Sequence, residues 1–247
     1  MSIQDEHDLE CLRAVGRIVR QVLDAMRAEV RPGVSTRYLD EVGARVIKQN
    51  GARSAPSLVY KFPGTSCISL NDEAVHGIPS EREVREGDLV KLDVTVEKDG
   101  YMADAAVTLP VGRIEKQAEQ LMICAEQAFR KAMLVARAGF RVFEIGRVVE
   151  REVRKSGFSV IPELAGHGIG RTIHEPPQVP NYPDPKASQI MKEGLVITVE
   201  PIISSGSGRI VKDKDGWTLR TADRSLSAHF EHTLVITAGS PILLTAG

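Results

Sequence analysis

The sequence predicts an α+β fold of two pseudo-symmetric halves, each with two helices followed by antiparallel strands. The segments EGDLVKLD (86–93) and EGLVITVE (193–200) share a Glu-Gly pair, an apolar run and a terminal acid, 107 positions apart. The stretches that begin at Arg31 and Arg137 also match, at an offset of 106. Solenoid units are much shorter than this repeat. We therefore expect two related halves that each bring a carboxylate-bearing strand to a shared centre.

Four amphipathic helices are expected, two in each half. The first should end before Pro32 and Gly33. The second is predicted over residues 35–50, and the equivalent pair near residues 115–137 and 141–156. The prediction of the first helix depends on apolar residues spaced three and four positions apart, namely Leu12, Val15, Val19, Val22, Leu23 and Met26.

A hairpin is predicted over residues 88–109, where two β-branched runs flank the turn dipeptide Asp99-Gly100. If these two residues form the loop, Asp104 lies opposite Thr95. Asp93 then projects from the same face of the sheet, since side chains alternate with a period of two. Two buried carboxylates repel each other, so this arrangement favours a bound cation. A three-residue loop would separate the two acids, and a strand-end Asp that faces water is the alternative.

From residue 158 onward the pattern indicates strands and loops that carry further candidate donors. His167 lies between glycines in GHGIG, and His174 follows seven residues later. Glu200 ends an apolar strand, and Glu231 precedes another. With the two hairpin acids, His167, Glu200 and Glu231 make five donors, an oxygen-rich set that suits two ions of manganese, iron(II), cobalt or zinc. His174 need not bind an ion with His167, because their spacing is not that of a helical zinc motif. The alternatives are surface carboxylates and a hydrogen-bonded core histidine.

Composition indicates an enzyme-sized chain and excludes several classes of protein. The 247 residues are 42% hydrophobic and 26% charged, enough for one full core. The net charge of −1 argues against binding to nucleic acid or a membrane surface. Three cysteines without paired spacing favour a reducing, cytoplasmic compartment. The polar N-terminal stretch is unlike a signal peptide. We expect residues 1–247 to form one catalytic domain, with halves of roughly 1–110 and 111–247.

Four segments together resemble the type I methionine aminopeptidases, in order and over nearly the whole chain. They are VKLDVTVEKDGYMADAA (90–106), GHGIGRTIHEPPQVPNY (166–182), ITVEPI (197–202) and TADRSLSAHFEHTLVIT (221–237). The resemblance implies the pita-bread fold, two divalent metal ions and removal of the initiator methionine from nascent chains. It also implies that Asp93 binds one ion, that Asp104 and Glu231 bridge both, and that His167 and Glu200 complete the other site.

The resemblance further implies the residues on the substrate side. His76 would lie near the substrate amine, and His174 would contact the scissile amide. The methionine pocket would be lined by an apolar set, namely Tyr60, Phe62, Cys67, Ile173 and Trp217. Ile173 stands where the family commonly has an aromatic residue. Ala105 and Ala106 stand where a hydroxyl residue is usual, so a hydrogen bond to the metal-binding carboxylate would be missing.

Two alternatives remain within the same fold. One is a proline-specific peptidase, although such relatives usually carry an additional N-terminal domain. The other is a catalytically inactive peptide-binding module, which is expected to lose metal ligands, whereas all five are present here. The partners implied are the N-terminal peptides of nascent chains, with the ribosome as a candidate, and we expect a monomer.

Overall fold

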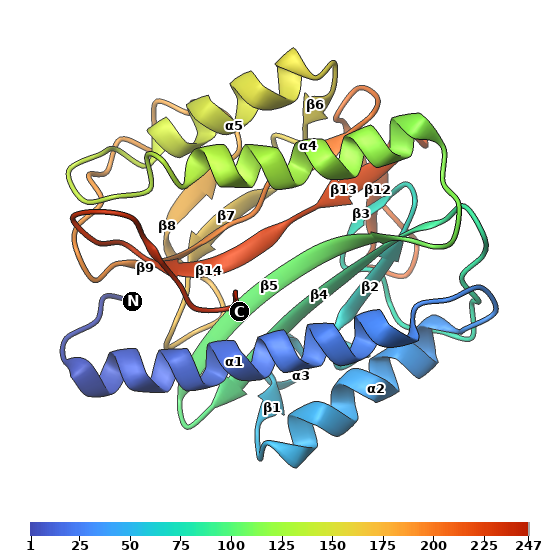
Figure 1. The fold of residues 1–247 in the computed structure, drawn as a ribbon, viewed down its shortest axis with the longest axis horizontal. Helices are drawn as coiled ribbons and strands as arrows, with labels where there is room; N and C mark the ends of the chain where they lie inside the picture. The colour runs from blue at the N-terminus through green and yellow to red at the C-terminus, as the bar shows by residue number, and fades with distance from the viewer. Residues whose placement is uncertain (247) are drawn as a thin grey trace.

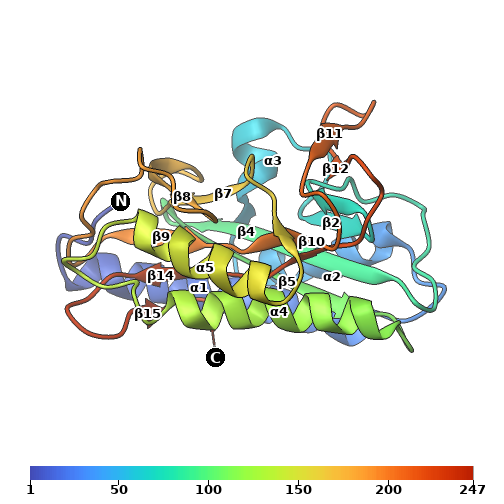
Figure 2. The same cartoon turned by 90° about the horizontal axis from the view of Figure 1, so that it is seen from above.

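Two pairs of helices lie on one face of a central antiparallel sheet in the computed structural model, which describes residues 1–246 (Figures 1 and 2). Helices α1 (Glu6–Glu29) and α2 (Thr36–Gln49) pack together, as do α4 (Lys116–Ala132) and α5 (Phe143–Lys155). Helix α5 begins 107 residues after α2, which is the offset of the strand repeat. The predicted α+β class is confirmed, and the order helix, helix, strand occurs twice.

The helix boundaries follow from local capping and from contacts farther along the chain. The Asp5 side chain accepts a hydrogen bond from the Asp8 N–H, and Ser35 caps α2 in the same way. The prediction that the third long helix reaches residue 137 was wrong, since α4 ends at Ala132. Beyond it the backbone N–H groups of residues 138 and 139 donate to carbonyls of residues 237 and 191 instead of continuing the helix.

The main sheet has nine strands, and its central path explains how the site is assembled. Strand β5 of the first half pairs with β14 of the second, so this pair forms the seam between the halves (Figure 1). Strand β2 (Cys67–Leu70) pairs with β4, and β15 (Ile242–Leu243) pairs with β14. The order along the path is β1 (Arg53–Ser54), β4 (Leu89–Lys98), β5 (Tyr101–Pro110), β14 (Glu231–Val235), β9 (Val196–Val199), β7 (Ala165–Gly168) and β8 (Glu175–Pro180).

The β4–β5 hairpin has the predicted register. Asp99 and Gly100 form the loop with φ of 52° and 81°, the positive values that a tight hairpin turn requires. Thr95 therefore lies opposite Asp104, and Asp93 lies opposite Ala106. The two aspartates share one face of the sheet, as the two-residue loop predicted.

Smaller elements build the rim on the face opposite the long helices (Figure 2). The short helix α3 (Ala55–Tyr60) was not among the helices expected from the sequence. Two three-stranded sheets complete the fold, and the first of them also packs against α4 and α5. One has the order β13 (Ser227–His229), β10 (Ile202–Ser204), β6 (Ser159–Val160), and the other β11 (Ile210–Lys212), β12 (Leu219–Thr221), β3 (Glu73–Val75).

A buried lysine links the two halves beside the sheet. Lys91 on β4 is 1% exposed. Its ammonium group donates to the carbonyl oxygens of Asn71 and Ser227, at 2.8 and 3.1 Å, and to the Ser227 hydroxyl at 3.2 Å. A buried cation is tolerated only when its donors are satisfied in this way, so Lys91 fixes β4 of the first half to β13 of the second.

Candidate active site

Five neighbouring strands of the main sheet each carry one of the predicted metal donors. Asp93 comes from β4, Asp104 from β5, Glu231 from β14 and His167 from β7, while Glu200 directly follows β9. All five line a single cavity of about 460 Å³. The sheet order thus brings together residues that are up to 138 positions apart in the sequence.

Strand register explains why the carboxylates face one another. Ala106 pairs with Asp93 on one side and with Glu231 on the other, and Asp104 precedes it by two positions. Residues in such a row, or two apart along a strand, point to the same face. A small side chain at Ala106 leaves the space between the two acids open.

The donor atoms lie close enough to share ions. The ligand atoms of Asp104, His167 and Glu231 are within 4.8 Å of one another. His167 Nε2 lies 3.6 Å from the Glu200 carboxylate. Within the described chain, Asp104 Oδ1 and Glu231 Oε1 are buried without a hydrogen-bond partner. Buried polar atoms are normally paired, so these two unpaired oxygens fit the role of metal ligands.

The electrostatics of the cavity lead to the same conclusion. Burial, followed by the charges of the neighbouring acids, raises the pKa of Asp93, Glu200 and Glu231 well above the ordinary values. Burial also raises the pKa of Asp104, to about 6, although hydrogen bonds oppose it. A divalent cation would reverse these shifts, because it stabilises the ionised carboxylates.

Close backbone packing holds His167 in place. A Cβ at Gly166 or Gly168 would collide with carbonyl oxygens of the adjoining strands, so only glycine fits on either side of the histidine. Thr198 Oγ1 accepts a hydrogen bond from the His167 N–H at 2.9 Å and donates to Glu200 Oε1 at 2.8 Å. Thr198, which the sequence analysis missed, therefore orients two donors together.

The predicted substrate residues line the same cavity. Phe62 packs edge-on against Trp217, with ring centroids 5.2 Å apart. Ile173 is 4% exposed. Burial, and then the charge of Asp93, raises the pKa of Cys67 well above its usual value, so the thiol is a neutral part of the wall. The lining set includes Tyr60, Phe62, Cys67, His76, Ile173, His174 and Trp217.

The two substrate-side histidines occupy the solvent-exposed mouth of the cavity. His174 Nδ1 shares a hydrogen bond of 2.6 Å with the Tyr60 hydroxyl, and its ring lies 4.2 Å from that of His167. His76 has a φ of 60°, a strained conformation that a non-glycine residue adopts at a cost of about 1–2 kcal/mol. Desolvation by the surrounding protein, followed by Coulombic repulsion from His174 and Lys212, lowers the pKa of His76 to about 4. Its imidazole is therefore neutral at pH 7.

One further histidine on the cavity wall was not predicted. His229 lines the cavity, and its Nε2 lies 3.1 Å from Glu231 Oε2. The ligand atoms of Glu200, His229 and Glu231 also lie within 4.8 Å of one another. Its position two residues before Glu231 in a strand-forming segment was the available signal, since such residues share a face.

A carboxylate-rich centre beside an apolar pocket defines a metallohydrolase type of site, and comparisons with known proteins assign the family. The chain matches the model of metallopeptidase family M24 over residues 10–238 and belongs to that family. It is 44% identical to methionine aminopeptidase 2 of Bacillus subtilis (strain 168), over 99% of both chains. It is 37% identical to the methionine aminopeptidase of Clostridium perfringens, over 98% of both.

Solved structures confirm the predicted pita-bread fold. The methionine aminopeptidase from Thermotoga maritima superposes with a TM-score of 0.96 at 32% identity, covering 100% of both chains. A prolidase from Pyrococcus furiosus has a TM-score of 0.80 at 22% identity, and the match covers 99% of this chain but 65% of the prolidase. The second likeness shows a shared fold alone.

Proposed function

We propose that this chain is a metal-dependent aminopeptidase that removes the N-terminal methionine of nascent proteins and peptides. The observation that carries the proposal is the convergence of five donor side chains on one cavity, whose lining also includes apolar side chains such as Phe62, Ile173 and Trp217. Its M24 family membership and its methionine aminopeptidase relatives support the same activity.

The donors would hold two divalent ions of manganese, iron(II), cobalt or zinc. Asp93 would help to hold one ion, His167 and Glu200 the other, and Asp104 and Glu231 would contribute to holding both. The orphaned oxygens of Asp104 and Glu231 support these assignments. When bound, such a pair of ions supplies a nucleophilic water at neutral pH and polarises the scissile carbonyl.

The side chains around the donors would carry the proton and position the substrate. Glu200 accepts a proton from the attacking water and delivers it to the leaving amine. His174 donates a hydrogen bond to the oxygen that becomes negative in the tetrahedral transition state. His76, which also lines the cavity, would lie near the substrate amine.

The apolar wall would select the first side chain. Phe62, Cys67 and Trp217 offer a neutral surface that suits an unbranched thioether.

We further propose that the chain acts on nascent chains in the cytoplasm as a monomer, with the ribosome as a candidate partner. Among the described residues, no helix is both long and apolar enough to cross a bilayer.

A metal and peptide assay tests this proposal. The purified chain should contain divalent metal by elemental analysis and cleave Met-Ala-Ser faster than Xaa-Pro peptides. A chelator should abolish cleavage, and Mn²⁺ or Co²⁺ should restore it. His167→Ala should lose both bound metal and activity. Preference for an Xaa-Pro bond would instead identify a proline-specific peptidase, and metal-independent peptide binding without turnover would identify an inactive module.

A further inference from the structure

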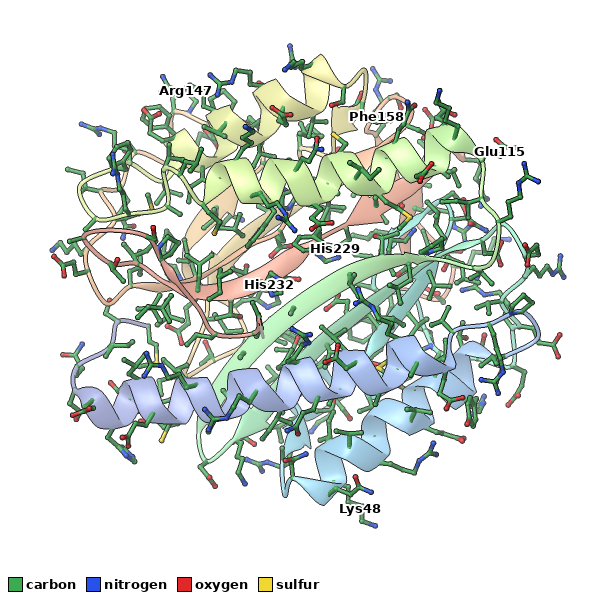
Figure 3. All side chains as sticks on the ribbon, in the orientation of Figure 1. Lys48, Glu115, Arg147, Phe158, His229 and His232 are labelled. Carbon is green, nitrogen blue, oxygen red and sulfur yellow. The ribbon has the colours of Figure 1, made fainter. Side chains whose placement is uncertain are left out.

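His229 is fixed at the junction of the two halves, on the wall of the metal cavity. It is 2% exposed and lies at the end of β13. Figure 3 labels it near the middle of the molecule, between the two pairs of long helices. Its backbone N–H donates to Thr108 Oγ1, and Thr108 Oγ1 donates to its carbonyl oxygen, both at 2.8 Å. These two hydrogen bonds therefore fix the backbone of His229 and limit how far its imidazole can move.

The imidazole of His229 approaches the Glu231 carboxylate, a proposed metal ligand, without forming a hydrogen bond to it. His229 Nε2 is 3.1 Å from Glu231 Oε2, yet within residues 1–246 this buried nitrogen has no hydrogen-bond partner. Two adjacent ligands of one ion, each bonded at about 2.1 Å, lie about 3 Å apart. The observed separation fits that arrangement, and Glu200 supplies a third atom within 4.8 Å of both.

We propose that His229 is an additional nitrogen donor of the metal centre, which binds through Nε2 an ion that Glu200 and Glu231 also hold. The inference rests on the proposed metallopeptidase function. It adds a second imidazole to the one that His167 provides. Imidazole favours cobalt, zinc and iron(II), whereas carboxylates suit manganese. The additional imidazole should thus shift the metal preference of the centre away from manganese and toward cobalt, zinc and iron(II).

Paramagnetic proton NMR of the Co²⁺-loaded wild-type protein tests the number of bound imidazoles directly. Each histidine that binds cobalt through Nε2 contributes one strongly shifted, solvent-exchangeable signal from its Nδ1–H. His167 Nδ1 contacts the Gly168 carbonyl at 2.9 Å, which leaves its Nε2 free for the ion. We expect two such signals in the wild-type protein. A single signal would overturn the inference without any variant being needed.

The His229→Gln variant gives a second, thermodynamic test. We expect one shifted signal to disappear and Co²⁺ affinity, measured by competition with a chromophoric chelator, to fall at least about tenfold. Mn²⁺ affinity should fall less. His232→Gln is the matched control, because this half-buried histidine bonds Thr245 Oγ1 through Nδ1 and lies outside the metal cavity. It should retain both signals and the wild-type affinities.

The outcomes separate this inference from the proposed function. A wild-type protein that binds no Co²⁺, or binds it but does not cleave Met-Ala-Ser, would refute the function itself. Wild-type binding and cleavage with equal Co²⁺ and Mn²⁺ losses in His229→Gln, and no change in the signal count, would refute only the donor role. Thermal unfolding of the metal-free proteins shows whether His229→Gln folds, and His229→Asn replaces it if it does not.

Discussion

The hydrogen bond between Tyr60 and His174 should set the orientation of the imidazole that we propose to contact the scissile amide. To donate from Nε2 toward the reacting oxygen, a neutral His174 must accept a hydrogen bond at Nδ1, where the Tyr60 hydroxyl lies 2.6 Å away. Tyr60→Phe removes this hydroxyl and keeps the ring that faces His174 at 5.6 Å. The substitution therefore isolates one hydrogen bond from the packing of the pocket.

The expected effect follows from the ordinary strength of such a bond. A hydrogen bond between neutral groups contributes about 0.5–1.5 kcal/mol. If that energy is used to hold the productive tautomer, its loss lowers kcat roughly two- to twelvefold. Tyr60 is 42% exposed, so water partly replaces the hydroxyl and the lower part of this range applies. Metal content and the free energy of unfolding should stay near the wild-type values.

A double-mutant cycle on Met-Ala-Ser hydrolysis measures the coupling. The variants are Tyr60→Phe, His174→Ala and the combination of both, with kcat and KM determined for each. We expect Tyr60→Phe to lower kcat in the wild-type background and to have no further effect once His174 is absent. An equal loss in both backgrounds would mean that Tyr60 acts on substrate binding alone, which would refute the orientation argument.

Three other substitutions test separate parts of the structure. His174→Ala should lower kcat about 100-fold or more, as loss of a transition-state donor does, while elemental analysis finds wild-type metal; metal loss would contradict its role. Ile173→Phe should raise the kcat/KM preference for Met over Leu or norleucine peptides up to about tenfold, and unchanged ratios would remove Ile173 from the pocket. Asp8→Asn should destabilise the protein at neutral pH, because the Tyr101 hydroxyl is the main cause that lowers the pKa of Asp8 below its ordinary 3.8. That stability is present above the unfolded pKa and is lost as pH falls through the lower folded value, so urea unfolding curves of the two proteins should converge in acid.

The hairpin was predictable because its determinants are local. Asp99 and Gly100 specify the turn, and the turn fixes which residues oppose each other. The alternation of side chains then determines that Asp93 and Asp104 share a face. Helices α1 and α2 were equally predictable, since their apolar periodicity and capping residues lie in or next to the segments themselves. The end of α4 was not, because contacts with distant carbonyls replace the helix there.

The rim of the cavity was not predictable from local pattern, because distant contacts stabilise it. Helix α3 has six residues, too few to form without tertiary packing. The bond between Tyr60 and His174 joins residues 114 positions apart. Cys67 faces Asp93 only because the four-residue strand β2 pairs with β4. The resemblance to a family pointed to these residues, and the folded chain shows how they meet.

His229 was missed for a different reason. Its strand changes partner within two residues, since His229 pairs with Ile202 of β10 whereas Glu231 pairs with Ala106 of β5. A period of two predicts the shared face, but it does not predict that the imidazole reaches the carboxylate across this change of partner. That approach depends on the packing of the two sheets against each other.

The change of partner occurs at the seam where strands β5 and β14 join the two halves. This seam couples metal binding to the folding of the chain. Thr233 Oγ1 donates to the Asp104 carbonyl oxygen at 2.7 Å and accepts from the Asp104 N–H at 2.8 Å, so β5 and β14 are held together by side chains as well as by their strand pairing. The cluster of Asp104, His167 and Glu231 exists only when this seam is formed, because its donors come from both sides. An ion bound there binds the folded chain and not the unfolded one. It would therefore stabilise the pairing of the halves by an amount that grows with the logarithm of metal concentration over Kd.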